Sequence, residues 1–446
     1  MRIQLSDHFT VRKLLRFTLP SIGMMIFTSI YGVVDGFFVS NFVGKTSFAA
    51  VNFIMPFLMF LGAVGFMFGS GGSALVSKTM GEGDKEKANR IFAMLVYVSM
   101  GVGVALTILG FLLIRPIASL LGAEGELLDN CVLYGRIVIL ALPTYIIHLE
   151  FQNFFVTAER PQLGFLSTVV SGVTNIVLDT LLVAVFPLGL VGAAVATTIS
   201  EIIGGVIPLV YFFRPNTSLL QLGKTVLDGK ALFQSCANGF SELIGNLSLH
   251  LVGMLYNLQL MKYAGESGVA AYGVLLYINT VFLAVFFGYT IGTAPIVGYH
   301  FGAQNHAELK GLLKKSIGVI GVASVSMFLL AQIFATPLSM IFVGYDAELL
   351  NMTRHGLRVY AFSFLFVGFG YFTPGFFTAL NDAVTSATIS MLRTLVAQIA
   401  AVMLLPLIFD VDGIWASVVA AEIMAMTMAA VFLIAKRNKI AVRSRS

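Results

Sequence analysis

Charged residues are scarce in this chain. Only 11% of its 446 residues are Asp, Glu, Lys or Arg, whereas a soluble protein of this length carries roughly 25%. Hydrophobic residues make up 58% of the sequence, and the mean hydropathy is +0.91. These values exclude an ordinary soluble domain and predict an all-α integral membrane protein with many spans.

Cysteine is nearly absent, and the motifs of several enzyme classes are missing. Cys131 and Cys236 lie 105 positions apart, which fits neither a metal site nor a redox motif. The sequence contains no Walker motif, nucleophile motif, His/Glu metal spacing or selectivity-filter repeat. We therefore expect a protein that is not an enzyme and that needs no cofactor and no ATP.

Long apolar runs fill most of the chain. Twelve of them have the length of a transmembrane helix, at about 14–39, 48–77, 91–114, 129–156, 163–186, 190–213, 232–261, 268–299, 312–335, 350–378, 384–407 and 413–435. With the N-terminus inside, 20 of the 27 Lys and Arg residues fall on inner connections or termini and five on the outer side. The positive-inside rule then predicts a multi-pass protein of the inner (plasma) membrane with both termini in the cytoplasm. The net charge of +5 is thus a topology signal and gives no reason to expect nucleic acid as a partner.

The second half of the chain repeats the first. An offset of 221 residues places Gly44 on Gly265, Gly81 on Gly302 and Glu201 on Glu422, and one offset serves the whole length. Six helices per half is an even number, so both halves share one orientation and are related by a pseudo-two-fold axis along the membrane normal. We expect an N-lobe at 1–213, a cytoplasmic linker at 214–231 and a C-lobe with a basic tail at 232–446.

One cluster of polar residues is expected inside the N-lobe. Asn175 and Asp179 share a helix face because they are four residues apart. Counting along the helices from Pro20, Pro187 and Gly189 places Asp35, Asp179 and Thr197 at a similar depth in the outer half of the membrane. Buried acids cost several kcal/mol unless they are paired, protonated or hydrated, so we read Asp35 as a functional residue. Two carboxylates with amide and hydroxyl oxygens suit a shared proton or Na⁺; the alternative for Asp179 is an interfacial helix end.

At this point the sequence resembles the multidrug and toxic compound extrusion (MATE) family over essentially its whole length. The phrase LPSI…YGVVDGFFVSNFVG carries the resemblance in the first helix, together with twelve helices in two lobes. In the prokaryotic DinF-like branch, a helix-1 Asp, a helix-5 Asn-x-x-x-Asp and a helix-6 Thr form the N-lobe cation site. The resemblance thereby implies this role for Asp35, Asn175, Asp179 and Thr197, with Na⁺ or a proton at the two acids. It also implies a gating role for Pro20 and a place in the N-lobe lining for Tyr134.

Helix 7 departs from another branch of the family. NorM-like members carry a helix-7 glutamate about eight residues after a proline, but here Ser241 replaces the proline and the expected position falls near Leu249. Glu242 lies about two turns too early, so we place ion coupling in the N-lobe. Asn246, His250 and Asn257 recur at helical spacing and either line a central substrate cavity or form interhelical hydrogen bonds.

The preferred function is a monomeric antiporter that exports small amphipathic, cationic organic compounds in exchange for H⁺ or Na⁺, with the lipid bilayer as its surroundings. The alternative is a flippase for a lipid-linked precursor. A flippase cavity is usually lined by several basic residues that hold a pyrophosphate, and few basic residues, chiefly Arg136 and Arg393, fall inside the helices here. Glu201 and Glu422 have either a packing role or a role in attracting substrate. The Arg136 side chain either extends outward toward the membrane surface or neutralises a carboxylate of the lobe.

Overall fold

The computed structural model describes residues 3–437, and this part of the chain is helical without a strand. The first half contains α1 (Val11–Phe38), η1 (Val39–Val43), α2 (Lys45–Gly81), α3 (Lys85–Leu120), α4 (Gly125–Val138), η2 (Ile139–Ala141), α5 (Leu142–Thr157), α6 (Pro161–Asp179), η3 (Thr180–Val185) and α7 (Gly189–Phe213). The second half contains α8 (Gly229–Gly302), α9 (His306–Ile333), α10 (Ala335–Val343), α11 (Ala347–Tyr360), η4 (Ala361–Ser363), α12 (Phe364–Ala379), α13 (Ala383–Met391), η5 (Leu392–Ala397), α14 (Gln398–Leu404) and α15 (Pro406–Ala435).

These elements form twelve spans. By length and composition, 11 helical stretches of the described chain can cross a membrane. One of them, α8, has 74 residues and folds back at Gly265, whose φ of 62° and ψ of −154° break the helix. It therefore supplies two antiparallel spans, and the expected number of twelve is confirmed.

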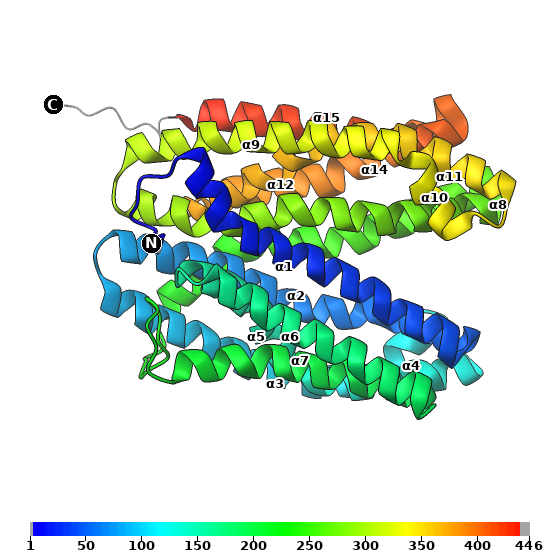
Figure 1. Cartoon of the computed structure of the whole chain (residues 1–446), viewed down its shortest axis with the longest axis horizontal. Coiled ribbons are helices and arrows are strands. Elements are labelled where there is room, and N and C mark those ends of the chain that lie inside the picture. Colours follow the sequence, from blue (N-terminus) through cyan, green and yellow to red (C-terminus); the bar gives the residue numbers. More distant parts are fainter. Residues whose placement is uncertain (1–2, 438–446) are drawn as a thin grey trace.

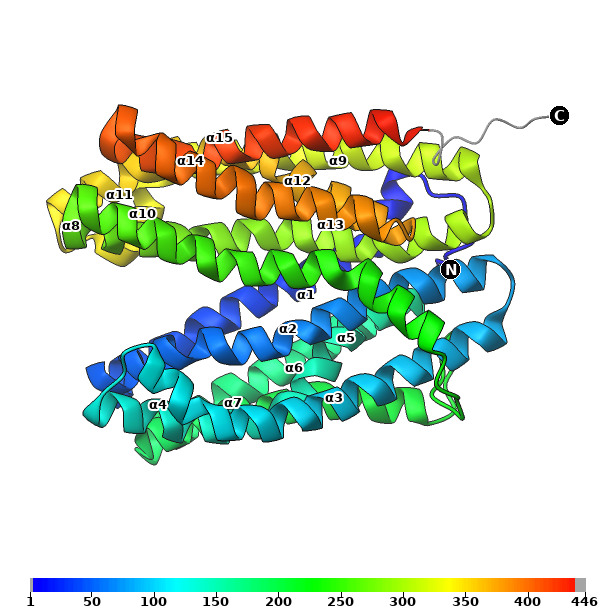
Figure 2. The same cartoon turned by 180° about the vertical axis from the view of Figure 1, so that it is seen from behind.

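The spans gather into two lobes. Figures 1 and 2 show α1–α7 in one half of the molecule and α8–α15 in the other, with α1 lying along the boundary. Residues 214–228 connect the lobes without regular secondary structure. The large apolar cluster around Trp415 is built mainly from the second lobe, with contributions from the N-terminal segment and α1, and two clusters fill the first lobe. The predicted fold of two six-helix lobes is thus confirmed.

The repeat is visible in the backbone itself. The broken span α4–η2–α5 has elements of 14, 3 and 16 residues, and α11–η4–α12 has the same three lengths. Residues with positive φ also recur in pairs 221 or 222 positions apart: Gly44 with Gly265, Gly83 with Gln304, Glu159 with Asn381, and Gly189 with Asp410. Such residues are uncommon outside glycine, so their recurrence shows that both lobes reverse direction at equivalent points.

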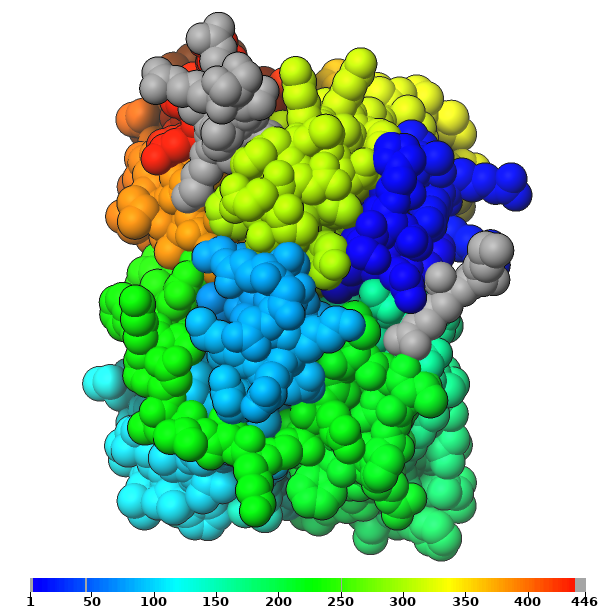
Figure 3. All heavy atoms as spheres, turned by 90° about the vertical axis from the view of Figure 1, so that its left-hand side faces the viewer, coloured from blue at the N-terminus to red at the C-terminus, as the bar shows by residue number. Residues whose placement is uncertain are grey.

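At the end of the molecule that carries the termini, the lobes pack tightly against each other. We call this contact the terminal seam; it joins α2 to both arms of α8 (Figure 3). A Cβ on Gly71 would lie 2.0 Å from the Ser235 carbonyl oxygen, and one on Gly302 would lie 1.9 Å from that of Lys78. Only glycine permits this approach of two backbones.

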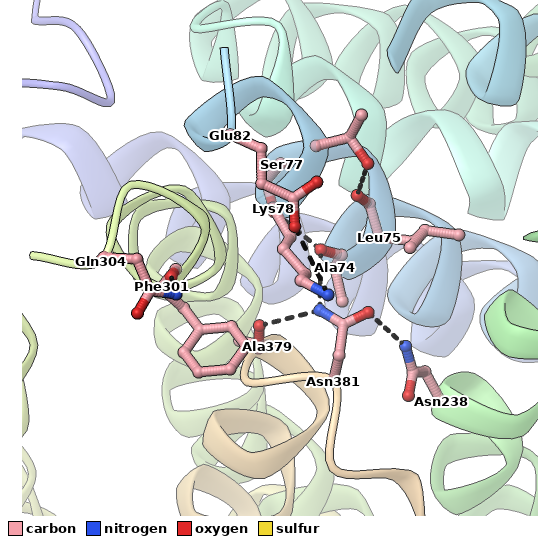
Figure 4. A network of polar contacts seen from close by, with 11 residues as sticks. Ala74, Leu75, Ser77, Lys78, Glu82, Asn238, Phe301, Gln304, Ala379 and Asn381 are labelled. Atoms are coloured by element: carbon pink, nitrogen blue, oxygen red, sulfur yellow. Dashed lines mark hydrogen bonds and ion pairs between the residues drawn. The ribbon is translucent and has the colours of Figure 1, made fainter. Parts of the chain in front are cut away.

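A small polar network fastens the terminal seam. The Asn381 amide donates to the Ala74 carbonyl at 3.2 Å, and Asn238 donates to the Asn381 side-chain oxygen at 2.7 Å. Figure 4 shows this network beside Lys78, whose ammonium group lies 5.9 Å from the centre of the Phe301 ring. The Asn381–Ala74 and Lys78–Phe301 contacts run between the lobes, and Asn238 holds Asn381 from within the second lobe, so the seam closes this end of the molecule.

Candidate functional site

Asp35 stands near the end of α1 and faces the interior of the first lobe. The helix continues unbroken through Pro20 and passes into the π-helical turn η1 four residues after Asp35. The Asp35 side chain is only partly accessible and lies against Asp179 and Asn175. The first helix therefore brings its single carboxylate to α6.

The face of α6 is shaped to receive α1. Asn175 and Asp179 are 2% and 0% exposed, and Gly172 lies one turn before them on the same face. A Cβ on Gly172 would meet the Phe27 ring at 2.5 Å and the Tyr31 ring at 2.9 Å. The missing side chain allows α1 to lie close enough for Asp35 to reach the two polar residues.

Several oxygens of this cluster are without a donor. Oδ1 of Asp35, both carboxylate oxygens of Asp179 and Oδ1 of Asn175 are buried and accept no hydrogen bond. A buried acceptor without a partner is costly, and a buried carboxylate pair more so. The arrangement suits a bound proton or a small cation that these oxygens would share.

A cavity of about 250 Å³, here called the N-lobe cavity, opens beside the cluster. Its polar lining includes Asp35, Asn175, Thr197, Ser200, Glu201, Tyr31 and Tyr145, and its apolar lining includes Met55, Leu58 and Met59. Tyr134 is fully buried and lies close to Thr197, Asp35 and Asp179. The structure thus brings the four expected cation-site residues and Tyr134 into one region.

Comparison with known proteins gives this architecture its family. The MatE family model matches twice, at residues 20–181 and 243–404, and the two matches cover most of the chain. The chain belongs to the MatE family. The two matched stretches also coincide with the two lobes, as expected for a duplicated MatE protein.

Relatives and solved structures match the MatE chain over nearly its full length. The multidrug export protein MepA of Staphylococcus haemolyticus is 26% identical over 98% of this chain and 96% of its own. MepA of Staphylococcus saprophyticus is 24% identical, over 95% of this chain and 94% of its own. A multidrug resistance MATE family transporter of the MOP superfamily, solved in an outward-facing conformation, shares the fold with a TM-score of 0.91 at 22% identity, covering 98% of both chains. The chain is therefore a multi-pass membrane transporter and not an enzyme, and the expected family is confirmed.

Two of the helix-7 candidates, Asn246 and Asn257, do not line the N-lobe cavity of this MatE protein. Asn246 lies on the first arm of α8 and donates its amide to the Glu242 carbonyl at 2.8 Å within the same helix. Asn257 is exposed, and the side chain of His250 lies outside the described part of the structure. This hydrogen bond engages only the amide nitrogen of Asn246, and its assignment to a central cavity or to an interhelical contact stays a prediction.

Beside the cavity lies a second pair of ionisable residues, Glu201 and His148, that the sequence did not predict. Glu201 lines the cavity and lies 3.0 Å from His148 Nδ1, with His148 only 3% exposed. Gly204 makes room for the imidazole, since a Cβ there would lie 2.6 Å from Nδ1. The histidine in α5 and the Gly204-Gly205 pair in α7 were the available signals in the sequence.

The repeat partner of Glu201 is also paired, though differently. Glu422 accepts hydrogen bonds from Arg393 Nε and Nη2 at 2.9–3.2 Å, and the Arg393 guanidinium lies 4.0 Å from the Tyr371 ring centre. Arg136 is exposed and stacks 4.8 Å from the Phe111 ring centre, so it takes the outward alternative. Neither arginine lines the N-lobe cavity, which lacks the basic lining that a pyrophosphate would need.

Proposed function

We propose that this MatE protein is an antiporter that exports amphipathic, cationic organic compounds in exchange for H⁺ or Na⁺. The observation that carries the proposal is the cluster of Asp35, Asp179 and Asn175 oxygens, buried without donors at the edge of the N-lobe cavity. Carboxylates placed in this way inside a membrane protein are typical of ion pathways. The DinF-like pattern of Asp35, Asn175, Asp179 and Thr197 supports the same assignment.

The N-lobe cavity has the chemistry of a site for an amphipathic cation. Tyr31 and Tyr145 offer aromatic faces, and Met55 and Met59 offer adaptable apolar surface. The Asp35 carboxylate opens into the same space and supplies a counter-charge. Export of such compounds agrees with the MepA relatives, which are named multidrug export proteins.

In the proposed mechanism, the coupling ion and the substrate compete for the N-lobe. Neutralising Asp35 and Asp179 with H⁺ or Na⁺ relieves the repulsion of two acids in a medium of low dielectric, which is worth a few kcal/mol. That energy shifts a two-state equilibrium by two or more decades. Pro20 leaves one backbone hydrogen bond of α1 unmade, so bending there is cheap and narrows the cavity. The substrate leaves outward, and the ion-loaded lobe returns to the inward-facing state.

The orientation belongs to the proposal as well. We assign the terminal seam, the linker at 214–231 and both termini to the cytoplasm, because most Lys and Arg residues lie on that side. In this assignment the closed terminal seam seals the inner face. The protein works as a monomer in the plasma membrane, with the N-lobe at 1–213 and the C-lobe at 232–446.

Binding measurements on purified protein test the shared site. Substrate affinity, followed with an ethidium-type dye, is expected to change across pH 5–9 or across Na⁺ concentrations at fixed pH, because ion and substrate exclude each other. The Asp35→Asn variant should lose this dependence and also lose dye efflux driven by an imposed ion gradient in proteoliposomes. The Asp129→Asn variant, whose acid is exposed and remote from the cavity, is the matched control. An affinity that stays constant in both series, or an Asp35→Asn variant that keeps the wild-type dependence, contradicts the mechanism.

A further inference from the structure

A second, much smaller pocket, lined by both polar and apolar residues, lies between the two lobes. Ser70 and Asn153 line it from the first lobe, and Glu242, Thr290 and Thr378 line it from the second. The Thr378 hydroxyl also donates to the carbonyl of Asn238, which belongs to the terminal seam. The volume is about 20 Å³, room for about one water-sized particle. An organic substrate is therefore too large for it.

Glu242 is the acid of this lining, and its carboxylate, when ionised, would give the pocket a negative charge. Its nearest charged neighbour is Arg393, but Arg393 holds Glu422 in a bidentate ion pair. With Glu242 ionised, the three side chains would sum to a charge of −1, which a bound cation would neutralise. Among the described residues, no side chain donates a hydrogen bond to the Glu242 carboxylate.

The other polar residues of the lining supply neutral oxygens with unused acceptor capacity. Ser70 Oγ is buried and has no hydrogen-bond partner. The Asn153 amide nitrogen donates to the Leu149 carbonyl, and the Thr290 hydroxyl donates to the Phe286 carbonyl, so their oxygen lone pairs remain available. One carboxylate with several hydroxyl and amide oxygens is a ligand set for a hard cation.

We propose that this pocket is a second cation site, which binds Na⁺ when the terminal seam is closed. Both lobes supply ligands, so the complete site exists only while Ser70 and Asn153 lie against Glu242. A ligand that binds one of two conformations shifts the population toward it. Phe66 and Phe287 meet edge to face at a centroid distance of 6.0 Å in the same lining and shield the pocket. Na⁺ at this site therefore holds the lobes together at the seam, independently of the ion at Asp35.

Distance measurements across the terminal seam test the proposal. Spin labels are attached at Glu86→Cys in one lobe and Lys310→Cys in the other, both exposed, in a Cys131→Ala/Cys236→Ala background. The label distance is followed while Na⁺ replaces K⁺ at constant ionic strength and pH. Na⁺ is expected to populate the short, seam-closed distance. The half-maximal Na⁺ concentration should rise at least tenfold in Glu242→Gln and severalfold in Ser70→Ala, and the response should survive in Asp35→Asn.

Three outcomes overturn the proposal. The first is a label distance that does not respond to Na⁺ in the wild type. The second is a Glu242→Gln protein that responds to Na⁺ as the wild type does. The third is a distance that follows pH but not Na⁺, which would mean that Glu242, Tyr371 or another neighbour of Arg393 titrates without binding metal. Since Asp35→Asn is measured in parallel, failure of this site is distinguishable from failure of the proposed coupling site.

Discussion

At the scale of single residues, two glycines decide which side chains meet around the N-lobe cavity. Gly172 admits α1 to the face of α6 that carries Asn175 and Asp179, and Gly204 admits the His148 ring to Glu201. Both contacts depend on the absence of a Cβ. The polar residues of the cavity are therefore positioned by small residues that take no part in binding.

Gly204→Ala tests this argument. The new Cβ would lie 2.6 Å from His148 Nδ1, so the imidazole must move and its contact with Glu201 is lost or lengthened. We expect a loss of stability of about 1–3 kcal/mol, as for other overpacked interiors. The melting temperature of the purified protein measures it. Gly101→Ala on α3 is the control, because a Cβ there meets nothing within 4 Å; equal melting temperatures for the two variants would contradict the packing argument.

The sequence predicted part of this site and missed another part for a physical reason. Asn175 and Asp179 followed from helical spacing, and Asp35 and Thr197 from counting residues along each helix. The Glu201–His148 contact depends on how α5 and α7 are rotated about their own axes. In membrane helices that are apolar on nearly all sides, the hydrophobic pattern does not reveal that rotation.

At the scale of elements, the helix reversals are the points where the repeat is best preserved. Gly44 and Gly265 occupy equivalent reversals with φ of 109° and 62°. At the last equivalent pair, glycine stands in the first lobe at Gly189, but the second lobe has Asp410 with φ of 49° and ψ of −130°. A side chain in this region costs on the order of 1–3 kcal/mol. The sequence offset predicted the pairing of these positions, whereas the strain is visible only in the backbone angles.

Asp410→Gly should therefore stabilise the protein. The substitution relieves the strained backbone but adds some freedom to the unfolded chain, so we expect a net gain of about 1 kcal/mol. Asp410 is exposed, which leaves packing unchanged. Thermal unfolding of the purified protein compares it with Asp410→Ala, which removes the carboxylate but keeps the Cβ and should give no gain. If both variants gained stability, the cause would be the loss of the carboxylate charge and the backbone argument would be wrong.

At the scale of the whole molecule, the structure establishes two lobes, and the charge pattern predicts how they are oriented in the membrane. The count of twelve spans and the duplication followed from hydropathy and a single sequence offset. The closure of the terminal seam could not be predicted from the sequence. It depends on close backbone contacts at four glycines, Gly71, Gly81, Gly239 and Gly302, and nothing in the sequence distinguishes these glycines from the others. The seam lies at the end with the linker, since the Thr225 hydroxyl donates to the Arg90 carbonyl beside the α2–α3 turn.

The orientation of that end in the membrane gives the last prediction. Lys224→Cys places an exposed thiol on the linker, and Tyr345→Cys places one at the turn between α10 and α11, where Tyr345 is 84% exposed. Both are made in the Cys131→Ala/Cys236→Ala background. A membrane-impermeant maleimide added to intact cells should label Tyr345→Cys and should label Lys224→Cys only after the membrane is opened. The physical reason is that Lys and Arg residues near the ends of spans are retained in the cytoplasm, and most of them lie at the end that carries Lys224. The reverse labelling pattern would mean that the protein has the opposite orientation in the membrane. The N-lobe cavity would then bind its ion from the opposite side.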